Sequence, residues 1–130
     1  MIKYLLDTNI CIFYFKKHRN ITQLLSQIDP ENCFISEISV AELYFGAVKS
    51  HQERHFREIA DLLTLIKVVP MYDTIKTYSD IRYYVEKNGK PIDNFDLLIA
   101  AAAITNDMTL VTDNTKHFAR IPGLKLVNWA

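Results

Sequence analysis

The chain has 130 residues, of which 49% are hydrophobic and 12% aromatic, which suits one domain with a substantial core. Its 3 glycines and 4 prolines are too few for a disordered chain or for an all-β fold rich in turns. Its 15 basic residues balance 15 acidic ones, so net charge provides no general attraction to nucleic acid or to an anionic membrane.

The first half of the chain predicts two buried strands and four helices. In chain order these are a strand at 2–6, helices at 10–15 and 21–28, a strand at 33–35, and helices at 39–48 and 53–66. Both strands are continuous apolar runs, which is typical of strands buried on both faces. The helix at 39–48 opens with Ser39-Val40-Ala41-Glu42.

The second half continues the same alternation. It predicts a strand at 67–70, helices at 72–85 and 95–104, a strand at 108–111, a short helix or turn at 117–118, and a strand at 124–127. The helix at 95–104 is apolar almost all round, so we expect it to be buried centrally. The alternation predicts a single three-layer α/β domain over residues 1–130, with a central, mainly parallel sheet of four or five short strands flanked by helices.

The two cysteines and the apolar segments indicate the setting of the protein. Cys11 and Cys33 lie among apolar residues and are interpreted as small buried side chains rather than as a disulfide or metal pair. No signal peptide is recognisable, and no apolar run approaches the roughly 18 residues that cross a membrane. The sequence therefore predicts a cytoplasmic protein that does not enter the membrane.

Four acidic residues stand beside predicted strands or helices, and each has a purely structural explanation. Asp7 can cap the helix that follows the first strand, and Glu42 can close a capping box with Ser39. Asp96 lies in the first turn of its helix, where the helix dipole favours an acid. Asp113 can form an Asx turn after its strand.

The same four acids are also expected to meet. The carboxyl ends of parallel strands lie along one edge of a sheet, and Asp7, Glu42 and Asp113 all follow predicted strands. The buried helix can bring Asp96 to that edge. Clustered carboxylates repel one another unless a cation neutralises them, and oxygen ligands without a Cys or His pair favour Mg²⁺ or Mn²⁺. Such a metal activates water and stabilises charge on a phosphate, which indicates phosphoryl chemistry.

Several segments resemble those of PIN-domain ribonucleases, and more narrowly those of VapC toxins from bacterial VapBC toxin–antitoxin pairs. These segments are Leu5-Leu6-Asp7-Thr8-Asn9, Ala41-Glu42-Leu43, Gly89-Lys90-Pro91-Ile92, Asp96-x-x-Ile99-Ala100-Ala101 and Val111-Thr112-Asp113-Asn114. The resemblance implies that the metal-binding and catalytic residues are Asp7, Glu42, Asp96 and Asp113. It also implies four supporting polar residues, Thr8, Asn9, Ser39 and Thr112. The fourth acidic position is often Asn in these toxins, and the extra acid Asp93 is interpreted as a helix cap.

The resemblance further implies an activity and partners. The expected activity is a divalent-metal-dependent endoribonuclease in which a metal-activated water cleaves RNA and leaves 5′-phosphate and 3′-hydroxyl ends. The tail of the chain, including Ile121-Pro122-Gly123-Leu124 and Asn128-Trp129, is similar to the subgroup that cuts initiator tRNA in its anticodon loop. The expected partners are a VapB-type antitoxin and a second copy of the chain, with the helices at 53–66 and 72–85 forming the homodimer.

Two other functions fit parts of the sequence. A non-catalytic α/β module that binds RNA or a partner would use the four acids only as helix caps. A phosphatase of the haloacid dehalogenase type requires Asp-x-Asp-x-Thr, and here the second Asp is replaced in Asp7-Thr8-Asn9-Ile10-Cys11. Two basic clusters, one between Lys49 and Arg57 and one formed by Lys116, His117 and Arg120, are either solvated surface or a rim that contacts phosphates.

Overall fold

A five-stranded parallel sheet forms the middle of the molecule. The computed structural model describes residues 1–130. The strands are β1 (Tyr4–Leu6), β2 (Cys33–Ser36), β3 (Lys67–Val69), β4 (Thr109–Val111) and β5 (Lys125–Val127). Their order across the sheet is β3-β2-β1-β4-β5, and every neighbouring pair is parallel. The prediction of four or five short strands in a mainly parallel sheet is confirmed, with five strands and β1 at the centre.

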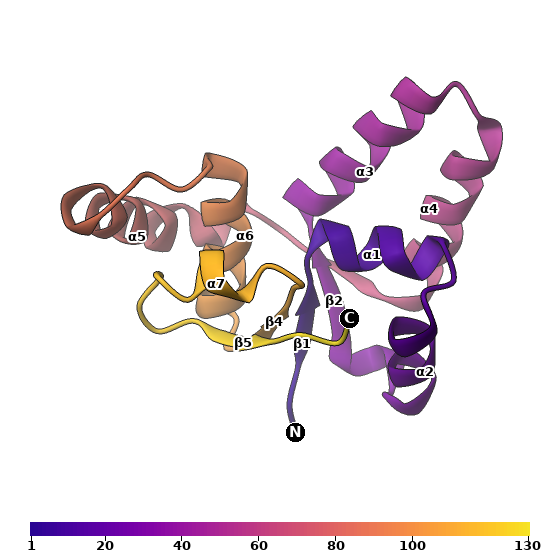
Figure 1. Cartoon of the computed structure of the whole chain (residues 1–130), viewed down its shortest axis with the longest axis horizontal. Helices are drawn as coiled ribbons and strands as arrows, with labels where there is room; N and C mark the ends of the chain where they lie inside the picture. The colour runs from indigo at the N-terminus through magenta and orange to yellow at the C-terminus, as the bar shows by residue number, and fades with distance from the viewer.

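Helices cover both faces of the sheet, as the alternating pattern predicted (Figure 1). In chain order they are α1 (Thr8–Phe15), α2 (Arg19–Gln27), the short 3₁₀ turn η1 (Pro30–Asn32), α3 (Glu37–Ser50), α4 (Glu53–Leu65), η2 (Tyr72–Thr74), α5 (Ile75–Asn88), α6 (Asn94–Thr105) and α7 (Thr115–Phe118). In Figure 1, α5 and α6 lie to the left, and α3 and α4 form a hairpin at the upper right. None of these helices combines the length and apolar character needed to cross a membrane.

The two faces of the sheet belong to two separate hydrophobic clusters. Successive residues of a strand point to opposite faces, so neighbouring Leu5 and Leu6 on β1 are divided between them. Leu5 packs in the cluster of α5 and α6, and Leu6 packs in the cluster of α1, α3 and α4. Helix α6 is apolar all round, and six of its residues are buried, from Leu97 to Ala103. The predicted three-layer arrangement with a buried central helix is therefore confirmed.

The N-termini of α3 and α6 test two helix caps predicted from the sequence. Helix α3 begins at Glu37, and its N-cap is Ser36, whose Oγ accepts a hydrogen bond from the Ser39 backbone N–H at 3.1 Å. The predicted capping box of Ser39 and Glu42 is wrong, because β2 runs directly into the helix and leaves Ser39 inside its first turn. The predicted cap Asp93 is confirmed, since its carboxylate accepts from the Phe95 N–H at 3.1 Å.

Both cysteines are buried, as predicted. Cys11 and Cys33 are 0% and 1% exposed. Burial raises the pKa of the Cys33 thiol to about 11 and raises that of Cys11 further. Thiols that stay protonated at neutral pH are poor nucleophiles, so these side chains act as packing groups.

Candidate active site

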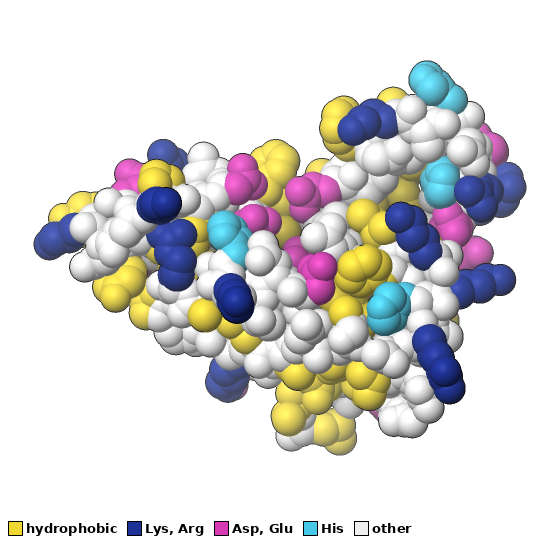
Figure 2. Space-filling model, viewed as in Figure 1, with side chains coloured by type: hydrophobic (Ala, Val, Ile, Leu, Met, Phe, Trp, Pro, Cys, Tyr) yellow, Lys and Arg dark blue, Asp and Glu magenta, His cyan; other side chains and the backbone are white.

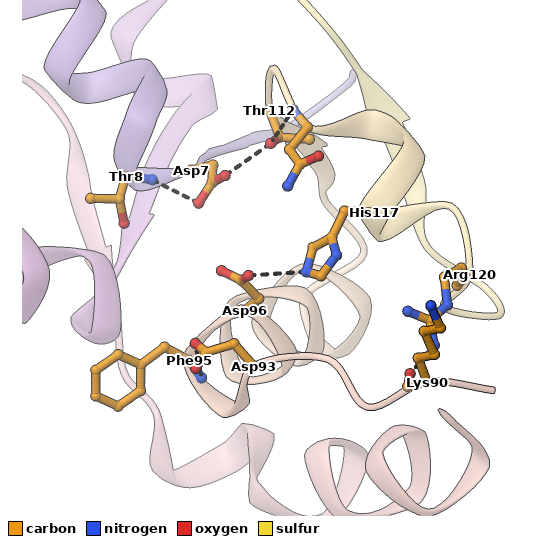
Figure 3. A network of polar contacts seen from close by, with 10 residues as sticks. Asp7, Thr8, Lys90, Asp93, Phe95, Asp96, Thr112, His117 and Arg120 are labelled. Carbon is orange, nitrogen blue, oxygen red and sulfur yellow. Dashed lines mark hydrogen bonds and ion pairs between the residues drawn. The ribbon is translucent and has the colours of Figure 1, made fainter. Parts of the chain in front are cut away.

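Asp7 lies where β1 ends and α1 begins, and both of its carboxylate oxygens are held by the scaffold. Oδ1 accepts the Thr8 backbone N–H at 2.8 Å, and Oδ2 accepts the hydroxyl of Thr112 at 2.9 Å (Figure 3). Asp7 is only 5% exposed. Burial raises its pKa from 3.8 to about 6, against the effect of the two hydrogen bonds, and the nearby acids Asp96 and Glu42 raise it further.

Glu42 projects from α3 and is tied to the start of α1 by Thr8. The Thr8 hydroxyl donates to Glu42 Oε1 at 2.6 Å and lies 2.9 Å from Ser39 Oγ. Ser39 is fully buried, and its hydroxyl contacts the Thr8 hydroxyl instead of capping α3. Burial raises the pKa of Glu42, the Thr8 hydrogen bond lowers it, and the charge of Asp96 raises it again.

Asp96 lies in the first turn of α6 and faces the other two acids. Its Oδ2 is 3.1 Å from Nε2 of His117, a residue of α7 (Figure 3). Burial raises the pKa of Asp96, while the neighbouring His117 lowers it. The sequence did not predict this contact, because 21 residues separate the two side chains.

The three acids line one polar pocket of about 110 Å³. The complete lining consists of Asp7, Thr8, Asn9, Glu42, Asp96, Asn114 and Phe118. Acidic side chains gather beside the central hollow of the molecule, and lysines and arginines lie mostly toward its outer edges (Figure 2). The expected convergence of Asp7, Glu42 and Asp96 at the carboxyl edge of the sheet is thus what the structure shows.

The turn after β4 places its residues differently from the sequence prediction. Asp113 is exposed and does not line the pocket, whereas the next residue, Asn114, does. Thr112 organises this turn, because its Oγ1 accepts the Asn114 backbone N–H at 3.1 Å while its hydroxyl donates to Asp7. The Asx turn predicted for Asp113 is therefore a turn built on Thr112. Of the predicted supporting residues, Thr8 and Asn9 line the pocket, and Ser39 and Thr112 lie behind it.

The chemistry of the pocket fits a hydrated divalent cation. No three acidic, histidine or cysteine side chains are grouped tightly enough to enclose a metal ion. Mg²⁺ does not require such a cage, because it commonly keeps several waters and uses one or two carboxylates together with substrate phosphates. Glu42 Oε2 and Asp96 Oδ1 accept no hydrogen bond within the chain and are free to bind it or its waters. A cation would also relieve the mutual repulsion that contributes to the raised pKa values of the acids.

A larger groove of about 300 Å³ starts at Glu42 and runs between α1, α3 and α4. Its floor is apolar, and its lining includes Lys16, Arg54 and His55. The predicted basic cluster between Lys49 and Arg57 thus contributes Arg54 and His55 to a groove that shares Glu42 with the acidic pocket.

The chain is similar, in sequence and in structure, to known proteins. The PIN domain family pattern matches residues 4–124. Ribonuclease VapC2 of Rickettsia felis is 38% identical over 132 residues, covering 97% of each protein, and tRNA(fMet)-specific endonuclease VapC of Shigella flexneri is 33% identical over 132 residues, covering 100% of each. The crystal structure of VapBC2 from Rickettsia felis bound to a DNA fragment from their promoter matches with a TM-score of 0.92 and 37% identity over 100% of both chains.

Proposed function

The chain belongs to the VapC ribonucleases of the PIN-domain family, and we propose that it cleaves a transfer RNA with a divalent cation held by Asp7, Glu42 and Asp96. The observation that supports this most strongly is the shared pocket. Three carboxylates from distant parts of the chain line one small polar cavity, and burial raises the pKa of each. Acids that served only as helix caps would gain nothing from facing one another, and their mutual repulsion would destabilise the fold.

The cation is proposed to be Mg²⁺, with Mn²⁺ as the alternative, because all the available ligands are hard oxygens. Bound there, a divalent cation supplies positive charge to the scissile phosphate and lowers the pKa of water. Asp7 orients the site from a rigid position, and Asp96 and Glu42 each present one free carboxylate oxygen. Asp113 is left out of this ligand set because it lies outside the pocket.

The residues of the pocket suit an in-line displacement. Water attacks phosphorus, the bond from phosphorus to the 3′-oxygen breaks, and the proton of water is passed on to the departing oxygen. Glu42 Oε2 accepts no hydrogen bond within the chain and, where it contacts a water rather than the cation itself, is suited to hold that proton in transit. The products carry 5′-phosphate and 3′-hydroxyl ends. Lys16 and Arg54 in the adjacent groove supply positive charge for the flanking phosphates.

The relatives suggest the substrate and partners. A relative that matches over the full length is named for cleavage of tRNA(fMet), so we take initiator tRNA as the first substrate to test, and with it a cytoplasmic site of action. A similar solved structure is a VapBC complex, so we expect a VapB-type antitoxin. We also expect a homodimer. Helix α5 supports it with the exposed apolar residues Ile75, Tyr83 and Tyr84, and α4 adds Leu65.

A cleavage assay tests the proposed reaction. Protein purified free of any partner is incubated with bulk tRNA in Mg²⁺, in Mn²⁺ and in EDTA. We expect cleavage with either metal, none in EDTA, and none with Asp96→Asn. The matched control is Asp61→Asn, which makes the same charge change at an exposed position of α4 and should cleave normally. Absence of metal-dependent cleavage of any cellular RNA by the wild type would contradict the proposal.

The substrate is tested separately in cells. Brief expression of the chain, followed by sequencing of new RNA 5′ ends, should reveal a dominant cut in the anticodon loop of initiator tRNA. The Asp96→Asn variant, expressed to the same level, should produce no such end. A dominant cut in another RNA would replace the proposed substrate and leave the proposed chemistry intact.

A further inference from the structure

His117 is the only side chain that hydrogen-bonds to Asp96. Its Nε2 lies 3.1 Å from Asp96 Oδ2, and the two side chains are 28% and 30% exposed. An ionised carboxylate can only accept hydrogen bonds, so Nε2 carries the proton and the imidazole is the donor. We propose that His117 is a positioning residue that fixes the Asp96 carboxylate for the divalent cation, an inference that rests on the proposed function.

The three acids differ in how the scaffold holds them. Asp7 has two donors, from Thr8 and Thr112, and Glu42 has one, from Thr8. The donors of all three hydrogen bonds are Thr8, at the start of α1, and Thr112, directly after β4. Asp96 lies on the opposite side of the pocket, beyond the reach of these groups, and His117 is its one partner. Without His117 the Asp96 carboxylate would be free to rotate about its side-chain torsions.

The imidazole is itself fixed by its neighbours along the chain. The next residue, Phe118, is 1% exposed, and its ring meets the His117 ring edge to face at a centroid distance of 5.4 Å. Phe118 also lines the acidic pocket. Because a buried aromatic anchors the short helix α7, the His117 ring approaches Asp96 from a defined direction.

A second contact fastens α7 to the segment that leads into α6. The Arg120 guanidinium donates to the backbone carbonyl of Lys90, as drawn in Figure 3. The same guanidinium packs closely against Gly89, since a Cβ there would be 3.1 Å from Arg120 Nη2. His117 and Arg120 thus tie the α7 segment to Asp96 in the first turn of α6 and to Lys90 in the loop before it.

This arrangement has a direct consequence for metal binding. With Oδ2 held by His117, Asp96 Oδ1 remains free and is turned toward the pocket that Asp7 and Glu42 also line (Figure 3). Residues that orient metal ligands in this way typically change metal affinity by about 10- to 100-fold when they are removed. The expected effect of losing His117 is therefore weaker metal binding rather than loss of the fold.

Metal binding is the first readout. Affinity for Mn²⁺ alone is measured by calorimetry for the wild type, His117→Ala, His117→Gln and Thr115→Ala. We expect His117→Ala to weaken binding by roughly 10- to 100-fold. His117→Gln keeps an N–H donor and should recover most of the affinity. Thr115→Ala removes a neighbouring side chain that makes no hydrogen bond and should bind as the wild type does. Unfolding in EDTA confirms that each variant is folded.

Cleavage is the second readout. The His117→Ala variant should need a correspondingly higher metal concentration for half-maximal cleavage, while its rate at saturating metal stays close to that of the wild type. Wild-type metal affinity in His117→Ala would overturn the positioning role. Failure of His117→Gln to restore metal affinity would also overturn the positioning role. That result would indicate that the imidazole itself binds the metal. If the wild type binds Mn²⁺ but cleaves no RNA, the proposed function fails while the binding series still tests His117.

Discussion

The Asp7→Asn variant is expected to lose cleavage and yet to be more stable than the wild type when metal is absent at alkaline pH. Asp7 is 5% exposed, and its pKa rises from 3.8 to about 6. A raised pKa means that the folded state holds the proton more tightly than the unfolded state. The stability that the folded protein gains from protonated Asp7 is therefore complete below pH 3.8 and is lost as the pH rises through about 6.

The size of the effect follows from the same pKa values. The rise in the pKa of Asp7 from 3.8 to about 6 means that ionisation of this residue lowers the free energy of unfolding by about 3 kcal/mol. Asparagine is neutral at every pH, its carbonyl can still accept the Thr8 N–H, and its amide faces the Thr112 oxygen. An imperfect fit of the amide reduces the gain, so we expect about 1–3 kcal/mol at pH 8 and almost none at pH 4.

Urea unfolding in EDTA at one-unit steps from pH 4 to pH 8 measures this difference. The matched control Asp61→Asn changes an exposed acid and should follow the wild type at each pH. Addition of Mg²⁺ at pH 8 should stabilise the wild type and not Asp7→Asn, because bound cation replaces the missing proton. An Asp7→Asn variant that is no more stable than the wild type at pH 8, or whose advantage is the same at pH 4, would refute the proposed electrostatic cost.

Three further substitutions test other parts of the structure. Asp113→Asn should change cleavage and Mn²⁺ affinity by no more than about twofold, since Asp113 is exposed outside the pocket, and a loss like that of Asp96→Asn would restore it to the ligand set. Ser36→Ala removes the cap of α3 and should lower the free energy of unfolding by about 1 kcal/mol in urea titrations; no loss would contradict the assigned N-cap. Gly46→Ala should raise that free energy by about 0.4–1 kcal/mol, because Gly46 lies within α3 with no atom within 4 Å of an added Cβ, and a decrease would be inconsistent with the open space there.

The layers of the fold and three of the residues that line the acidic pocket were predictable from the sequence for physical reasons. Buried parallel strands must be apolar on both faces, so runs such as Tyr4–Leu6 are recognisable without any partner in view. Once the sheet is parallel, topology alone brings the ends of β1 and β2 to one edge. Asp7, Glu42 and Asp96 therefore meet in one pocket, although no local pattern joins them.

The remaining details depend on geometry that local sequence does not determine. Ser36 and Ser39 are equally good helix caps, and the choice between them depends on how far β2 extends. After β4, the hydrogen bond from Asn114 N–H to Thr112 decides that Asn114 rather than Asp113 faces the pocket. The approach of His117 to Asp96 requires α7 to dock beside α6, which only the folded chain reveals.

The helix cap made by Asp7 does not compete with the metal binding proposed for it. The Thr8 N–H fixes one of its oxygens and the Thr112 hydroxyl fixes the other, so the carboxylate cannot rotate away from Asp96 and Glu42. The repulsion among the three acids consequently stays in the folded protein until a proton or a cation neutralises it. A flexible acid would avoid this repulsion by moving into solvent, and would also bind a cation less tightly, because its ordering would oppose binding. The cap thus helps to prepare the pocket for the proposed cation.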